Sequence, residues 1–155
     1  MAAWRFAVAF VVVTLMPAAA QAPAEPDPVA QAFLSQLPSE QAAQVSTGVV
    51  SYSKASKAWW IESRCHLAVS MNAGNFSDDL ASLTRAMNTL FRVRLNLAAD
   101  KAQEQVEYIQ MYALEQMSSA KFFGCGDQAK AVLQQGYAET ERYANFAREH
   151  AAGRQ

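Results

Sequence analysis

The sequence predicts an all-α protein, a small helical bundle of about four main helices with one disulfide. After Pro38 the chain holds no further proline, and its filler residues are Ala, Gln, Glu, Leu, Met and Arg, which form helices readily. Apolar residues recur at spacings of three and four, without the sustained alternation that a β-strand would show. The two cysteines, Cys65 and Cys125, allow a single intramolecular pairing.

The first 20 residues are typical of a secretory signal peptide and are excluded from the fold. A positive charge precedes an apolar run, residues 6–16, and small residues follow it. This run is about half as long as the roughly 20 residues that a membrane-spanning helix needs. Cleavage is expected after Ala20, and Ala22 is the alternative, with Pro23 next to the cut bond. The sequence therefore predicts a periplasmic or secreted protein that does not span the membrane once the signal is removed.

The charge balance argues against nucleic acid as a partner. Loss of Arg5 with the signal peptide leaves 12 of the 13 Lys and Arg residues against 14 Asp and Glu residues. The two signs are interspersed along the chain, whereas nucleic-acid binding draws on clustered Lys and Arg that release counterions. About 130 mature residues suit one core, so residues 29–155 are predicted to form a single helical domain.

A tether and two helices are expected in the first half of the mature chain. Residues 21–28 hold three prolines, which favour an extended, solvated tether. Residues 29–37, between two prolines, are expected to form a short helix. A long helix is expected from Ser39 to about Ala73, with a bend near Gly48 and a C-cap at Gly74, where glycine tolerates a positive φ.

The second half is expected to form the other main helices. Ser77 is the predicted N-cap of a helix that runs to about Leu97, and Asp100 either caps a new helix or continues the same one as far as Ser119. Asp127 is the predicted N-cap of the last helix. The predicted core positions are Ala42, Val45, Val49, Tyr52, Trp59 or Trp60, Leu67, Phe76, Leu80, Leu83, Met87, Leu90 or Phe91, Leu97, Ala102, Val106, Ile109, Ala113, Met117, Ala129, Val132 or Leu133, Gly136, Tyr137, Thr140, Tyr143, Ala144 and Ala147.

The two cysteines are predicted to form a disulfide. Paired cysteines usually close in an oxidising compartment, and a separation of 60 residues makes the crosslink worth roughly 4 kcal/mol of loop-closure entropy. Gly124 and Gly126 would let the backbone at Cys125 turn sharply and approach the helix of Cys65. The alternative is a thiol enzyme in which Cys125, just before a helix N-terminus, is the nucleophile and a histidine is the base.

No cofactor and no catalytic residue are predicted. A zinc site is disfavoured because Cys65 and His66 are adjacent and point about 100° apart on a helix. The missing C-x-x-C-H motif excludes covalent haem, and non-covalent haem held by His150 and a methionine is an alternative. Hydrolase, metalloprotease and phosphate-binding motifs are also missing from the sequence.

Two adjacent tryptophans supply the candidate partner-binding residues. Trp59 and Trp60 cannot both face one core, so one of them is expected at an edge. Lys57 and Arg64 lie about one turn away, and an aromatic ring with a neighbouring cation is a frequent anchor of protein interfaces. We therefore predict partner binding by Trp59, Trp60, Lys57 and Arg64.

The first functional hypothesis is an exported, non-enzymatic helical protein that binds another protein or an envelope component, in the manner of a chaperone, an inhibitor or an immunity protein. Small disulfide-linked helical proteins of the bacterial envelope, such as acid-stress chaperones and toxin immunity proteins, are similar to this chain in size, export and cysteine number, and no motif links them to it. The alternatives are a small-molecule or haem-binding bundle with a pocket near Met87, Met111 and Tyr137, or a thiol enzyme using Cys125.

Overall fold

The computed structural model describes residues 27–67, 73–119 and 124–152, and the predicted signal peptide lies outside these ranges. Within them the chain is all-α and holds no strand. The prediction of a small helical bundle with a disulfide between Cys65 and Cys125 is confirmed. The helices are α1 (Pro28–Leu34), α2 (Ser39–Cys65), α3 (Ala73–Arg94), α4 (Ala99–Ser119) and α5 (Asp127–Ala152).

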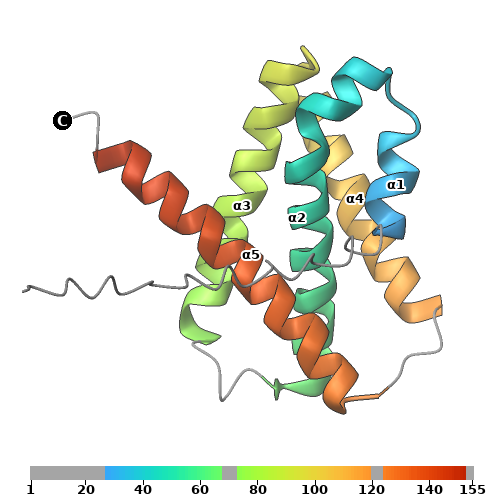
Figure 1. Cartoon of the computed structure of the whole chain (residues 1–155), viewed down its shortest axis with the longest axis vertical. Coiled ribbons are helices and arrows are strands. Elements are labelled where there is room, and N and C mark those ends of the chain that lie inside the picture. Colours follow the sequence, from blue (N-terminus) through green and yellow to red (C-terminus); the bar gives the residue numbers. More distant parts are fainter. Residues whose placement is uncertain (1–26, 68–72, 120–123, 153–155) are drawn as a thin grey trace, which may run out of the picture.

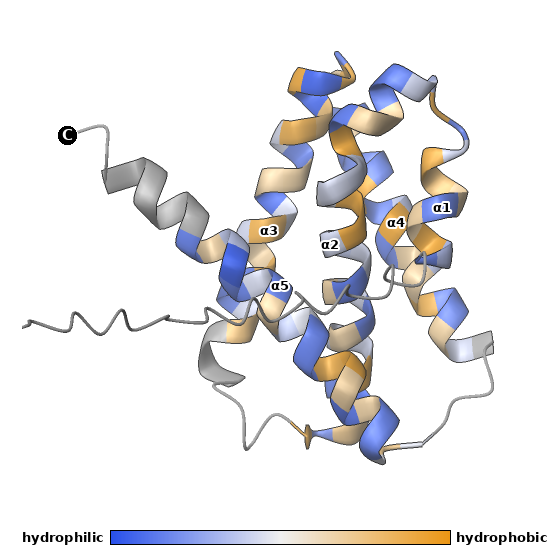
Figure 2. Ribbon diagram, in the orientation of Figure 1, coloured by the Kyte–Doolittle hydropathy of each residue, from blue (hydrophilic) through white to orange (hydrophobic). Residues whose placement is uncertain are grey.

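Helix α2 is the centre of the bundle, and each of the other four helices packs against it. Helices α1 and α4 lie on one side of α2, α3 lies on the other, and α5 crosses α2 and α3 obliquely (Figure 1). Because neighbours surround α2, side chains on several of its faces are removed from water. The peripheral helices bury one face each, and blue and orange residues are mixed along them (Figure 2).

Helix α1 begins where the tether was predicted to continue. Asp27 is its N-cap: the carboxylate accepts hydrogen bonds from the backbone N–H of Val29 and of Ala30, at 3.0 and 3.1 Å. The last two residues of the predicted tether, 27 and 28, therefore belong to the start of α1, and residues 21–26 lie outside the described ranges. The helix ends at Leu34, earlier than predicted, and a turn leads into α2.

The predicted boundary between the second and third helices is wrong. Helix α2 ends at Cys65 because His66 adopts a left-handed conformation with φ of 50°, and α3 already includes Gly74, the predicted C-cap, and Ser77, the predicted N-cap. Residues other than glycine reach the left-handed region at a cost of about 1–2 kcal/mol. Since His66 lacks the glycine signal of a helix end, the sequence did not indicate this boundary.

The other helix boundaries agree with the predictions within a residue or a few residues. Of the two alternatives near Asp100, the structure shows the break: α4 is separate from α3, after a turn in which Asn96 has φ of 53°. Asp100 is the second residue of α4 and not its N-cap. Asp127 is the first residue of α5 and not the residue before it. The predicted bend near Gly48 stays a prediction, and the helix is continuous through this residue.

The core predictions hold well for the peripheral helices. All five predicted core positions of α4 are buried: Ala102, Val106, Ile109, Ala113 and Met117. Where the spacing left two choices, the buried residues are Trp60, Phe91 and Leu133. In α2 the predicted stripe is incomplete, because Ser51, Ser53 and Ser56 are also at most 1% exposed.

Small residues let α5 cross α2 at short range. A Cβ on Gly136 would collide with Cβ of Ala58 and would lie 2.9 Å from the carbonyl oxygen of Lys54. The two backbones therefore approach as closely as the missing side chain allows. Gly48 acts in the same way towards α3, since a Cβ there would lie 2.7 Å from Cδ2 of Leu90.

None of the helices in the described ranges combines the length and the apolar character needed to cross a membrane.

Candidate functional site

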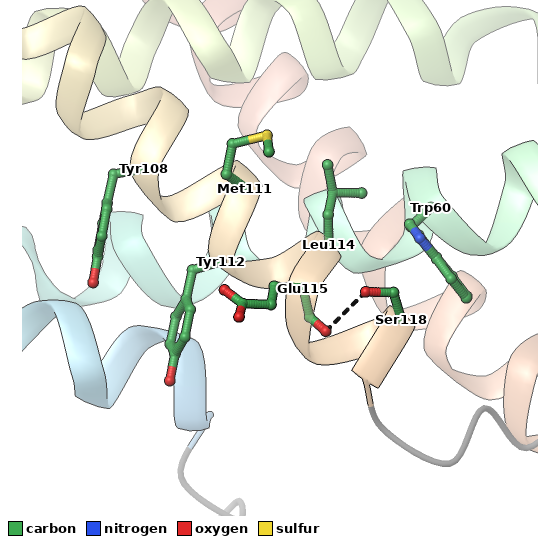
Figure 3. Close-up of a pocket in the computed structure, with 7 residues that line it drawn as sticks. All are labelled: Trp60, Tyr108, Met111, Tyr112, Leu114, Glu115 and Ser118. Atoms are coloured by element: carbon green, nitrogen blue, oxygen red, sulfur yellow. Dashed lines mark hydrogen bonds between the residues drawn. The ribbon is translucent and has the colours of Figure 1, made fainter.

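A groove of about 610 Å³ runs along the outer face of α4 (Figure 3). Helix α2 contributes one aromatic ring at its end, and α4 contributes the rest of the lining. Tyr108 and Tyr112 point towards one side of α4, whereas Met111 and Leu114 point towards the other (Figure 3). The complete lining is Trp60, Tyr108, Met111, Tyr112, Leu114, Glu115 and Ser118. We call this surface the α2–α4 groove.

The groove exists because α4 has a second face rich in apolar side chains. Its first face is buried against the bundle. Tyr108, Met111, Tyr112 and Glu115 follow spacings of three and four on a different face. Met111 is 64% exposed and Tyr108 is 42% exposed. Isolated apolar residues are common on protein surfaces, but a contiguous set along a groove is typical of an interaction site.

Helix α1 holds the tyrosine side of the groove in place. The ring of Phe33 lies 6.3 Å from that of Tyr108, and Nε2 of Gln36 donates a hydrogen bond to the Tyr108 hydroxyl at 3.2 Å. Tyr108 also stacks on Tyr112, with ring centroids 6.1 Å apart and planes 14° apart. The two tyrosines are therefore ordered by α1 before anything binds, which lowers the entropy lost on binding.

The other end of the groove is the edge of Trp60. Its ring is 6% exposed and packs in the same apolar cluster as Leu114 and Met117. The Arg64 guanidinium carbon lies 4.5 Å from the ring centroid, a cation–π contact one turn along α2. Trp60 thus joins the groove to the core beneath it.

A nearly buried ion pair ties α1 to α2. Nζ of Lys57 lies 2.7 Å from Oδ2 of Asp27, and the Ser53 hydroxyl donates to Oδ1 at 2.9 Å. The side chains of Asp27 and Lys57 are 8% and 16% exposed. Burial raises the pKa of Asp27, but the Lys57 ammonium and the hydrogen bonds lower it by more, so this pKa lies below its ordinary value.

The four predicted partner-binding residues fall in different places. Trp60 lines the groove, and Arg64 stacks on its ring. Lys57 is engaged with Asp27, so its ammonium holds α1 in place. Trp59 is 41% exposed and is not part of the groove lining. Their role in partner binding stays a prediction, and in the structure Trp60 alone of the four belongs to the groove.

The prediction from sequence missed the contribution of α4 to the groove. A signal was present: once its core positions are assigned, Tyr108, Met111 and Tyr112 are left as large apolar residues on a different face of the same helix. Tyr108 and Tyr112 have contacts with Phe33 and with the core, respectively, whereas Met111 is 64% exposed and its position is not explained by packing of the core face.

The disulfide bears on the thiol-enzyme alternative, which needs Cys125 as a free thiol. Cys65 and Cys125 are bonded to each other, with Cα atoms 5.4 Å apart, so neither sulfur is a free thiol. Gly124 has φ of 75° and makes the predicted sharp turn. The chain at Cys125 does lie close to Cys65, but the predicted reason is wrong, because a Cβ on Gly124 or on Gly126 would meet no atom within 4 Å.

The structure does not bring together the residues proposed for an inter-helix pocket. Met87 is fully buried in the core and packs near Gly48, whereas Met111 faces solvent. The Tyr137 ring packs against that of Phe76, with centroids 4.2 Å apart and planes 38° apart, and lies in the other apolar cluster. The side chain of His150, the proposed haem ligand, lies outside the described residues. In the described part of the chain no three or more His, Cys, Asp or Glu side chains are arranged to hold a metal ion.

A smaller groove between α2 and α5 is lined mostly by polar residues that contact one another. Its volume is about 310 Å³. Glu139 accepts a hydrogen bond from the Ser51 hydroxyl at 2.8 Å and pairs with Arg142 at 2.7 Å and with Lys54 at 3.5 Å. This network connects α5 to α2, and it satisfies its own polar groups, so it is better explained as a structural contact.

No protein-family model matches the sequence, and neither a curated protein nor a solved structure matches it. A functional conclusion for this chain therefore depends on the residues and geometry of its own surface.

Proposed function

We propose that this is an exported, non-enzymatic helical protein that binds another protein or an envelope component through the α2–α4 groove. The observation that carries the proposal is the contiguous exposed apolar surface of α4, where Met111 and Tyr108 are 64% and 42% exposed. Burial of such side chains against a partner is favourable, at roughly 25 cal/mol per Å² of apolar surface.

Export is supported by two independent features. The first 20 residues have the order of charge, apolar run and small residues that is typical of a signal peptide. The bond between Cys65 and Cys125 is the state that an oxidising compartment favours. A periplasmic or secreted location agrees with both features.

A binding role is supported over a catalytic one by the chemistry of the groove. Rings, a methionine and a leucine dominate its lining, and Glu115 is the one carboxylate among the lining residues. General acid–base chemistry usually needs two groups with different proton affinities facing one substrate. Apolar surface with a polar rim is instead typical of protein interfaces.

The proposal is tested by photocrosslinking in the cells that make the protein, with the chain exported by its own leader. Met111 is replaced by benzoylphenylalanine, and the matched control carries the same residue at Val93, which is 69% exposed on α3 and does not line the groove. We expect a discrete crosslinked adduct from position 111 that position 93 does not give.

Two results would contradict the proposal. Identical adducts from both positions, or none from position 111, would mean that the groove is not a binding surface. An intact mass that retains residues 1–20, or two alkylatable cysteines without reduction, would mean that the chain is not exported in the proposed way.

A further inference from the structure

We propose that the α2–α4 groove binds a cationic amphipathic helix of a partner protein. Apolar side chains of that helix would enter the groove, and its Lys or Arg side chains would lie over the carboxylates of α4. The inference rests on the proposed binding function and specifies the chemistry of the partner.

The first argument is the charge of α4. The helix carries four carboxylates, those of Asp100, Glu104, Glu107 and Glu115, and one cation, Lys101. The Lys101 ammonium lies 2.8 Å from Glu104, so the cation compensates a neighbour on its own helix. Helix α4 is therefore negative overall and favours a partner of opposite charge, whereas Arg64 of α2 adds one cation at the Trp60 end of the groove.

The second argument is the placement of these charges. Residues 104, 107, 111, 115 and 118 follow spacings of three and four and share the outer face of α4. Glu104 and Glu107 precede the apolar section, and Glu115 follows it. At 1.5 Å per residue, Glu104 and Glu115 are about 16 Å apart along the helix axis. A partner helix of about three turns, apolar where it meets Tyr108 and Met111 and cationic at the end that lies over Glu107, fits this arrangement.

The third argument is the shape of the lining. The α2–α4 groove is lined by Tyr108 and Tyr112 on one side of α4 and by Met111 and Leu114 on the other (Figure 3). Amphipathic helices bind to grooves of this kind through apolar anchors that are three and four residues apart. Methionine is flexible and polarisable, so Met111 can adapt to the anchor that it contacts.

One aromatic ring of the groove also suits a cationic partner. The Trp60 ring is already covered by the guanidinium of Arg64, so the contact is expected at the other end of the groove. The exposed ring of Tyr108 offers a similar surface to an Arg or Lys of the partner.

Other occupants fit less well. A second copy of this chain would place the carboxylates of two α4 helices against each other, and like charges at an interface are costly. A bilayer with anionic lipids would repel the same carboxylates. A cationic helix is the occupant whose charge complements that of α4.

The test uses the full disulfide-bonded mature chain and two synthetic 18-residue helical peptides of leucine and lysine or leucine and glutamate, with leucine in the same positions. Binding of fluorescently labelled peptide is followed by anisotropy at low and high salt. We expect the lysine peptide to bind at least about tenfold more tightly than the glutamate peptide, and to weaken as salt screens the carboxylates.

Three variants localise the effect. Met111→Lys and Glu107→Lys are each expected to weaken binding of the lysine peptide about tenfold. Val93→Lys adds the same charge as Met111→Lys at an exposed site outside the groove, and should leave binding of the peptide nearly unchanged. All three positions are exposed, and thermal unfolding of each variant shows whether the fold is kept.

The outcomes separate this inference from the proposed function. Equal or tighter binding of the glutamate peptide, still weakened by Met111→Lys, would overturn the cationic partner and leave the groove as a binding site. Lysine-peptide binding that none of the groove variants weakens more than Val93→Lys would overturn the assignment of that partner to the groove. Absence of binding by either peptide, with no adduct from position 111, would overturn both.

Discussion

Helices α2 and α4 are both long, at 27 and 21 residues, but they use polar and apolar side chains in opposite ways. In α2 the hydroxyls of Ser51 and Ser53 are at most 1% exposed. In α4 the large side chains of Met111 and Tyr108 face solvent. At these four positions the usual relation between side-chain polarity and burial is therefore inverted.

The serines of α2 are buried because α2 has many neighbouring helices. Four helices pack around it, so small side chains are needed where α5 comes close, and hydroxyls are tolerated when they find acceptors. The Ser51 and Ser53 hydroxyls donate to Glu139 and to Asp27, respectively. Burial in α2 thus serves packing, whereas in α4 the side chains of Met111 and Tyr108 stay 64% and 42% exposed, which supports the proposed role in binding.

The largest effect on stability is expected when the C-terminal end of α2 is freed from α5. Replacement of Cys65 and Cys125 by serine should lower the free energy of unfolding by about 4 kcal/mol, since the bond closes a loop with a separation of 60 residues. Urea unfolding of the oxidised protein and of the double variant measures the difference. A loss below about 1 kcal/mol would mean that packing alone holds this end of α2 in place.

The crossing of α2 and α5 should be nearly as sensitive. Gly136→Ala is expected to cost about 3 kcal/mol, because the new methyl group would collide with Ala58 and the backbones would have to separate. Gly126→Ala is the matched control: a Cβ there meets nothing within 4 Å, and the change should stay within about 0.5 kcal/mol. Equal unfolding midpoints for the two variants would show that the crossing tolerates a wider spacing.

The ion pair between Asp27 and Lys57 should make stability depend on pH in acid. The pKa of Asp27 is lower in the folded protein than its ordinary value of 3.8, so its contribution is fully present above that pH and is lost as the pH falls through the folded pKa. Asp27→Asn keeps an acceptor for the α1 N-cap but removes the charge, and should cost about 2 kcal/mol at pH 7.

The control for this pair lies on α4. Lys101 and Glu104 form an exposed ion pair, with side chains 58% and 56% exposed, and Lys101→Met should leave the stability nearly unchanged. Unfolding of both variants between pH 2.5 and 7 separates the two cases, a range set by the ordinary carboxyl pKa of about 4. If Asp27→Asn leaves the acid dependence of stability unchanged, the pair with Lys57 is not its source.

The accuracy of prediction followed the number of neighbours of each helix. In α4 the residues facing the core were all predicted, since a helix that packs on one side shows its buried face as a period in the sequence. In α2 the buried serines were missed, because contacts with four other helices leave no single stripe. The end of α2 at His66 was missed as well, because a non-glycine residue holds the left-handed position.

Part of the candidate site, the Trp60 end of the groove, was predicted from the sequence. The tryptophan pair indicated an edge of the bundle, and Trp60 does line the groove. The structure added the α4 residues, because their exposure depends on where α1 ends and on which face of α4 no helix covers.

By itself the sequence determined the helical class, the disulfide and the buried face of each peripheral helix, because propensity, cysteine parity and periodicity are local or countable properties. The tertiary structure decided which helix is central, how closely α5 crosses it, and that Trp60 lines the same groove as Tyr112 and Met111. These properties depend on contacts between residues far apart in the chain, and such contacts form only when the helices pack.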